Sequence, residues 1–197
     1  MTTAVTPVRP LRAGTVLADL LPVGRTRDIA LVVGGAALTG IAAQIAVPVP
    51  GSPVPVSGQT FAALLVGTAL GARRGFLSLA LYALAGMAGV PWFAQASSGW
   101  AMPSFGYILG MLLAGTVVGA LARRGADRSV LRTAGTMALG SLVIYAVGVP
   151  YLALATGMTL SQAIAAGLTP FLIGDALKAA LAMGLLPTAW KLVGRKG

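Results

Sequence analysis

Long apolar segments separated by small groups of basic residues are the feature of this sequence that most restricts its fold. The 14 lysines and arginines fall into four groups, with a single lysine outside them. Successive groups are separated by 45, 48 and 58 residues, more than twice the roughly 20 residues of one membrane-spanning helix. The groups are Arg9, Arg12, Arg25 and Arg27; Arg73 and Arg74; Arg123, Arg124, Arg128 and Arg132; and Lys191, Arg195 and Lys196.

Each interval between these groups has room for two crossings joined by a short loop. We therefore predict an all-α integral membrane protein, a bundle of six transmembrane helices. All four basic groups then lie on one side of the membrane, and because cytoplasmic loops are enriched in Lys and Arg, both termini are predicted to be cytoplasmic. The expected helices cover about 29–47, 58–72, 75–90, 104–122, 132–154 and 166–190.

This topology divides the chain into a cytoplasmic N-terminal segment (1–28), a six-helix transmembrane domain (29–190) and a cytoplasmic tail (191–197). The three connections on the other side are expected near 48–55, 91–103 and 155–163. None of the three contains Lys or Arg, as the predicted orientation requires.

The composition supports a membrane protein and argues against an enzyme. The chain is 57% hydrophobic and 9% charged, with a mean hydropathy of +0.89, and it contains no Cys, no His and no Glu. Thiolate nucleophiles, His-dependent triads, imidazole metal ligands and paired glutamates are therefore absent. We expect no catalytic residue, no metal and no cofactor. The net charge is +10, but the basic residues lie between the apolar segments and do not form a basic patch with interleaved aromatic residues. No nucleic-acid partner is therefore expected.

Asp175 and Lys178 are the only charged residues between Arg132 and Lys191. On a helix their spacing of three places both side chains on one face. Each would cost roughly 2.5–3.5 kcal/mol near the centre of a bilayer, so both should face a partner, a cavity or a ligand. The pair is a candidate binding site, and the alternative is a self-neutralised pair that only stabilises the bundle.

Two further polar segments are candidates for binding. Gln59 and Thr60 follow a rigid Pro-rich and Gly-rich loop and begin the second expected helix, where they could hold a polar ligand or bond to neighbouring helices. The longest external loop and the start of the next helix mix aromatic residues with Ser97, Ser98 and Tyr107. Such a mixture suits a pocket for an amphipathic molecule, although the aromatic residues would equally anchor the loop at the membrane surface.

Small residues recur along the first expected helix. Ala36 and Gly40 are spaced by four, so another helix could approach closely there. The stripe could form an interface with a partner protein or pack inside the bundle, and the sequence does not distinguish these alternatives.

Several motifs resemble the BioY family of biotin-specific S components, the substrate-binding subunits of energy-coupling factor (ECF) transporters. These motifs follow one another in the family order and extend through nearly all of the membrane region. They are AQIAVPVPGSPVPVSGQTFAALLVGTALGARRG (43–75), LYALAGMAGVPWFA (81–94), PSFGYILG (103–110) and FLIGDALKAALA (171–182).

The resemblance implies a six-helix substrate-binding domain in the cytoplasmic membrane of a prokaryote, where it captures biotin from outside. It also implies a transmembrane T component and two ABC-type ATPase subunits as partners, although some members of the family are reported to work alone. The sequence contains no P-loop motif, so ATP hydrolysis would have to come from other subunits.

The family's GD-x-x-K motif places Asp175 and Lys178 at ligand-binding positions, and its P-V-x-x-Q-T motif does the same for Gln59 and Thr60. The external loop adds Ser97, Ser98 and Tyr107. This chain departs from the family at Phe105, where glycine is usual.

Two alternative functions remain open on the sequence. The chain could be an S component for another vitamin, which binding of biotin against thiamine and riboflavin would reveal. It could instead be an autonomous ion-coupled carrier in which Asp175 is the coupling group, and such a carrier would respond to collapse of the proton gradient.

The predicted topology can be tested by labelling, since the native chain has no cysteine. We expect Ser52→Cys and Ser98→Cys to react in intact cells with a thiol reagent that cannot cross the membrane, because both lie in external loops. Ala126→Cys should stay unlabelled. Labelling at Ala126 from outside would refute the six-span arrangement.

Overall fold

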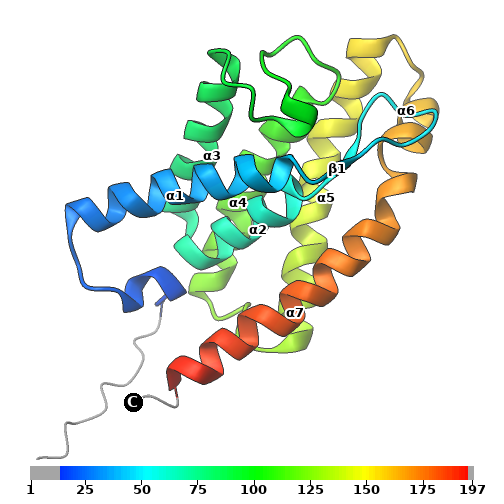
Figure 1. The fold of residues 1–197 in the computed structure, drawn as a ribbon. Coiled ribbons are helices and arrows are strands. Elements are labelled where there is room, and N and C mark those ends of the chain that lie inside the picture. The colour runs from blue at the N-terminus through cyan, green and yellow to red at the C-terminus, as the bar shows by residue number, and fades with distance from the viewer. Residues whose placement is uncertain (1–13, 195–197) are drawn as a thin grey trace, which may run out of the picture.

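The computed structural model describes residues 14–194, which form a bundle of helices (Figure 1). The all-α class and the count of six predicted helices are confirmed, with one additional short helix, α6. The basic residues Arg9, Arg12, Arg195 and Lys196 lie outside the described residues. The helices are α1 (Arg25–Ala43), α2 (Gln59–Leu70), α3 (Ala72–Met87), α4 (Phe105–Arg123), α5 (Val130–Thr156), α6 (Leu160–Gly167) and α7 (Leu172–Gly194).

Short elements complete the fold. The connection between α1 and α2 is a small antiparallel hairpin in which Ala46 pairs with Ser57 and Val47 with Val56. Its strands are β1 (Ala46–Val47) and β2 (Val56–Ser57), and the 3-10 helices are η1 (Leu17–Leu20), η2 (Ala94–Ala96) and η3 (Thr169–Phe171).

The last predicted helix, 166–190, differs most from the structure. It is divided into α6, the single turn η3 and α7, because α6 ends at Gly167 and η3 contains Pro170, which has no backbone N–H to continue the hydrogen-bond ladder. Two other helices are also displaced from their predicted ranges. Helix α1 is shifted by four residues toward the N-terminus relative to the predicted range 29–47. Helix α3 begins at Ala72 instead of residue 75, so that Arg73 and Arg74 lie within its first turn.

Helices α2 and α3 are joined by one residue, Gly71, whose φ of +82° is favourable for glycine but not for other residues. Helix α2 has 12 residues and α3 has 16. Their lengths of about 18 and about 24 Å are shorter than a hydrocarbon core of about 30 Å. In the described chain, the helices long and apolar enough to cross a membrane are α1, α4, α5 and the combined segment Leu160–Val193. Helices α2 and α3 therefore need the neighbouring helices to bury them within the bundle.

Contacts between glycines hold α2 and α3 against α4. A side chain on Gly67 of α2 would overlap the backbone of Gly115 in α4, and a Cβ on Gly75 of α3 would lie 2.8 Å from the Cα of Gly67. The three helix backbones can approach this closely only because these positions lack side chains. Around this contact the core is apolar, with Leu79 and Met111 fully buried.

The basic groups that the structure describes meet at one end of the bundle. Arg74 of α3 forms an ion pair with Asp19 at 2.7 Å, and Arg128, after α4, donates to the carbonyl oxygen of Thr15. The end of α7 reaches the same place, because Trp190 Nε1 donates to the buried carboxylate of Asp127 at 2.7 Å. The clustering predicted from the charge pattern is confirmed, whereas the cytoplasmic location of this end stays a prediction.

The opposite end carries the hairpin and the loop between α3 and α4. Gln44, at the end of α1, donates from Nε2 to the carbonyl oxygens of Trp92 and Phe93 and accepts from the backbone N–H of Ala96. Trp92 in turn donates to the carbonyl oxygen of Tyr82 at 3.0 Å. These bonds attach the loop to α1 and α3, so this end of the bundle has a defined shape.

Candidate functional site

A cavity lies beneath the hairpin, where the first turns of α2, α4 and α7 meet the middle of α5. Five of the residues expected to bind a ligand line it: Gln59, Thr60, Tyr107, Asp175 and Lys178. They come from three helices that are far apart in the sequence. The other lining residues are Val54, Pro55, Ser57, Ser141, Ile144, Tyr145 and Phe171.

Lys178 is the centre of the polar network in this cavity. Its Nζ donates to Thr60 Oγ1 at 2.8 Å and to Asp175 Oδ1 at 3.1 Å. The second carboxylate oxygen of Asp175 accepts a hydrogen bond from the Tyr145 hydroxyl at 2.5 Å. The side chains of Lys178 and Asp175 are 18% and 17% exposed, so the two charges are shielded from the surroundings and compensate one another.

This network leaves hydrogen-bonding capacity for a ligand. An ammonium group has three donors, of which Lys178 uses two, and a carboxylate can accept more bonds than the two that Asp175 receives.

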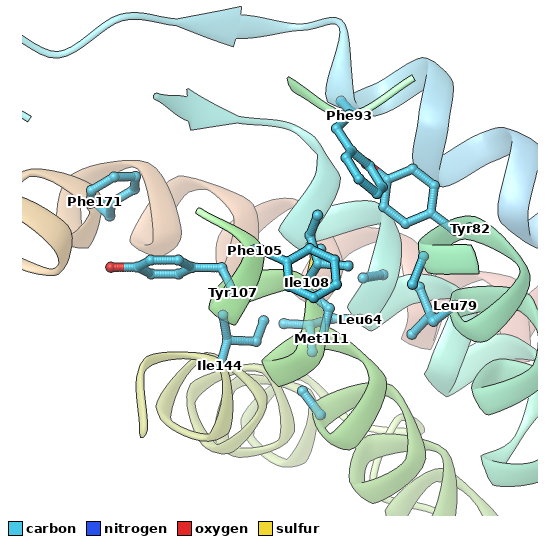
Figure 2. Close-up of a cluster of buried hydrophobic side chains, with 14 of the residues drawn as sticks. Leu64, Leu79, Tyr82, Phe93, Phe105, Tyr107, Ile108, Met111, Ile144 and Phe171 are labelled. Carbon is cyan, nitrogen blue, oxygen red and sulfur yellow. The ribbon is translucent and has the colours of Figure 1, made fainter. Parts of the chain in front are cut away.

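Aromatic residues form one wall of the cavity. Tyr107 stacks on Phe171 with ring centroids 6.4 Å apart and an angle of 24° between the ring planes (Figure 2). The Tyr107 hydroxyl donates to the carbonyl oxygen of Gly167 at 2.7 Å, which links α4 to the end of α6. Tyr145 meets the Tyr107 ring edge to face. The wall therefore offers flat apolar surface beside the charged pair.

Gln59 contributes from the start of α2. Its Oε1 accepts a hydrogen bond from the buried Tyr82 hydroxyl at 2.9 Å, which orients the side-chain amide. With one lone pair of the carbonyl oxygen used in this way, the side chain keeps the two donors of its NH₂ group and one further acceptor site.

The free volume between the lining residues is only about 20 Å³, so the cavity is a narrow cleft. Val54 and Pro55 of the hairpin loop close one side of it, and Val54 is only 5% exposed. A ligand larger than a few atoms could therefore enter only if side chains or the hairpin moved apart.

The structure does not bring Ser97 and Ser98 to this cavity. Ser97 Oγ donates to the carbonyl oxygen of Ala94 at 2.7 Å within its own loop, and Ser98 is exposed. The loop is held against α1 through Gln44. Contact of these two serines with a ligand stays a prediction.

The proposed partner surface on α1 is occupied within the chain. Ala36 is 1% exposed, and a Cβ on Gly40 would lie 2.9 Å from the ring of Trp92. These contacts favour internal packing, the alternative to a partner interface at Ala36 and Gly40. The open face of α1 includes Gly34, around which no atom lies within 4 Å of an added Cβ.

Three polar residues of the cavity, Ser57, Ser141 and Tyr145, were not expected from the sequence. Ser141 and Tyr145 lie one helical turn apart on α5, in the middle of a predicted span. Their spacing of four and their polarity in an apolar segment could have indicated a polar site. Many spans, however, carry single hydroxyl groups that bond only to their own helix. The sequence does not show which face of α5 meets α7, because that depends on how the helices pack.

The chemistry available here is binding. In residues 14–194 no cluster of three or more potential metal-binding side chains occurs. The cavity combines one cation, one carboxylate, several hydroxyls and an aromatic wall, which suits a small molecule with an anionic group and a polar ring.

Both the sequence and the fold of this chain are similar to those of known proteins. The family model described as the BioY family matches residues 11–195 of this chain. A protein of Pyrococcus horikoshii named "Probable biotin transporter BioY" is 36% identical over 162 residues, which cover 81% of this chain and 93% of that protein. "Biotin transporter BioY2" of Lactococcus lactis is 35% identical over 157 residues, covering 78% of this chain and 85% of that protein.

A solved structure has a similar fold. It is a crystal structure of the S-component for biotin from an ECF-type ABC transporter, with a TM-score of 0.76 over 86% of this chain and 95% of that chain. The sequences are 19% identical, so this likeness concerns the arrangement of the helices.

The packing of α1 leads to a prediction with a matched control. Gly40→Leu should lower the melting temperature in detergent by several degrees, because the new side chain has to displace the Trp92 ring. Gly34→Leu makes the same change on the same helix where no atom lies within 4 Å of the new Cβ, and it should leave the melting temperature nearly unchanged. Equal melting temperatures for the two variants would show that Gly40 is not packed inside the chain.

Proposed function

The chain belongs to the BioY family, whose model matches residues 11–195, and from this premise we propose that it captures biotin as the S component of an ECF-type transporter. The observation that carries the proposal is the cavity in which Lys178, Asp175 and Thr60 meet beside an aromatic wall. Relatives named biotin transporters support the choice of ligand.

The protein is a multi-pass membrane protein of a transporter family and not an enzyme. We place it in the cytoplasmic membrane of a prokaryote, with the basic end of the bundle in the cytoplasm and the cavity near the outer face. The charge pattern supports this orientation, since the basic residues of the described chain other than Lys178 gather at the end opposite the hairpin.

The groups of biotin match those of the cavity. Biotin has a carboxylate on a flexible tail and a ureido ring whose N–H groups need acceptors. We assign the carboxylate to the third donor of Lys178 and the ureido N–H groups to Asp175, with Gln59 and Thr60 as further polar contacts. The stacked rings of Tyr107 and Phe171 provide the apolar surface for the rest of the molecule.

The narrow cleft indicates how binding would proceed. In the structure Asp175 receives hydrogen bonds from Tyr145 and Lys178, so the charged pair is satisfied without a ligand. Biotin would replace part of this internal bonding as Val54 and the hairpin loop move away from the cleft. Exchange of one set of hydrogen bonds for another avoids leaving a buried charge without partners.

Energy for uptake would come from other subunits. The sequence has no P-loop motif, and the similarity of fold to an ECF S-component supports association with a T component and two ABC-type ATPase subunits. The contact with these subunits would use a surface other than Ala36 and Gly40, which the chain itself covers.

The assignment of the site can be tested with charge. Lys178→Met should weaken biotin binding by about 30-fold or more, because it removes the buried partner of the carboxylate. The same variant should bind an uncharged biotin amide with much less loss. Asp175→Asn should weaken binding of both ligands, since the ureido acceptor is impaired in each case. Isothermal titration calorimetry of the purified chain would provide the four affinities.

Two controls separate binding from folding. Lys191→Met removes an exposed lysine at the basic end and should leave biotin affinity unchanged. The double variant Asp175→Asn, Lys178→Met removes both charges, so neither remains uncompensated. If it folds and binds biotin with the affinity of the wild type, the pair is structural and the site assignment is wrong.

The energy source distinguishes an S component from an autonomous carrier. In cells that contain the T component and the ATPases, biotin uptake should stop when ATP is depleted and should persist when the proton gradient alone is collapsed. The opposite pattern would indicate ion coupling through Asp175. Competition by thiamine and riboflavin in the same assay would reveal a different vitamin as ligand.

A further inference from the structure

An open groove lies between α1 and α3 at the basic end of the molecule, separate from the cavity beneath the hairpin. Its volume is about 620 Å³. The two helices contact closely where α1 crosses α3, since a Cβ on Gly35 would lie 2.6 Å from Ser78 Oγ (Figure 1). The groove is the space beside this crossing, and it is formed by the first half of α1 and one face of α3.

The body of the groove is apolar and open. Ile29 and Val33 of α1 are 59% and 51% exposed, and Leu77 and Leu84 of α3 are 44% and 62% exposed. From Arg73 at the basic end to Leu84, α3 rises about 16 Å. This length is close to half of a hydrocarbon core of about 30 Å, which is the depth of one leaflet.

The basic end of the groove carries more positive charge than the described chain neutralises. Five arginines and two aspartates lie around it, which leaves an excess of three positive charges. Burial acts to raise the pKa of Asp19, but hydrogen bonds from Arg74 and the Val16 N–H and the charges of Arg74 and Arg123 hold it below its usual value, so this carboxylate is ionised at neutral pH. The charged residues are Arg25, Arg27, Arg73, Arg74, Arg123, Asp19 and Asp28.

Two of these arginines have no carboxylate partner among residues 14–194. Arg74 bridges Asp19 and Asp28, whereas Arg25 and Arg73 form no ion pair and are exposed beside the groove. Guanidinium groups bind phosphate oxygens with two parallel hydrogen bonds. Unpaired arginines at the end of an apolar groove therefore fit a phosphate that is attached to an acyl chain.

We propose that this groove is a binding site for one anionic phospholipid of the leaflet at the basic end. The phosphate lies between Arg25 and Arg73, and an acyl chain follows the apolar face of α3 past Leu77 toward Leu84. The positive excess favours a lipid with net negative charge over a zwitterionic one, as at other basic pockets between membrane helices. The apolar wall favours a lipid over a soluble phosphate, which would leave that wall uncovered.

Native mass spectrometry of the purified full chain, titrated with phosphatidylglycerol and with phosphatidylcholine, tests the site. We expect tighter binding of phosphatidylglycerol. Arg25→Gln and Arg73→Gln should each weaken it about fivefold, the effect of one basic residue near an anionic lipid. Neither change breaks an ion pair of the described chain. Ala80→Trp, which fills the apolar wall, should also weaken it.

Matched variants outside the groove are the controls. Arg124→Gln removes an exposed arginine at the same end of the molecule, and Ala120→Trp adds the same bulk on the exposed face of α4. Both should leave phosphatidylglycerol binding unchanged. Equal effects of Arg124→Gln and Arg73→Gln would mean diffuse attraction to basic charge and would overturn the proposal. Equal affinity for the two lipids would also overturn it. If phosphatidylglycerol binding were unaffected by Ala80→Trp and the lipid were displaced by glycerol phosphate, the groove would hold a phosphate without an acyl chain, and the proposal would again be overturned.

Discussion

The close approach of α2 to α4 at Gly67 and Gly115 is the contact on which the rest of the structure depends. Helix α2 is too short to cross the membrane on its own and turns directly into α3 at Gly71. Its position is therefore determined by how deeply it can settle against α4. That depth places Thr60, in the first turn of α2, within hydrogen-bonding distance of Lys178 on α7. The close glycine contact near the C-terminal end of α2 thus positions Thr60 at its N-terminal end.

The two ends of the bundle differ in how far their charges are neutralised. In the cavity, one cation and one carboxylate compensate each other and are shielded, which makes Lys178 and Asp175 tolerable at membrane depth. At the basic end, arginines outnumber carboxylates, and Arg25 and Arg73 have no ion-pair partner in the described part of the chain. A compensated pair suits a ligand that exchanges hydrogen bonds with it, whereas an uncompensated excess suits an anion that stays bound at the membrane surface.

The tyrosines connect the cavity to the rest of the fold. Tyr107 links the start of α4 to the end of α6, and Tyr145 links α5 to Asp175 on α7. Gly167 and Pro170, which end α6 and interrupt the helix there, create the short turn that Tyr107 reaches. The break in the last predicted helix is therefore part of the site, because a continuous helix would have no free carbonyl group at Gly167 for the Tyr107 hydroxyl.

The sequence by itself determined the membrane class, the count of six helices and the candidate pair of Asp175 and Lys178, because each depends on composition or spacing along the chain. Charge is costly in a bilayer at any position, so the rare charges could be singled out without coordinates. Only the tertiary structure decided that Tyr145 joins this pair and that Ser97 lies apart from it. Such choices depend on how helices rotate and approach one another, and small residues allow many arrangements that differ little in local sequence.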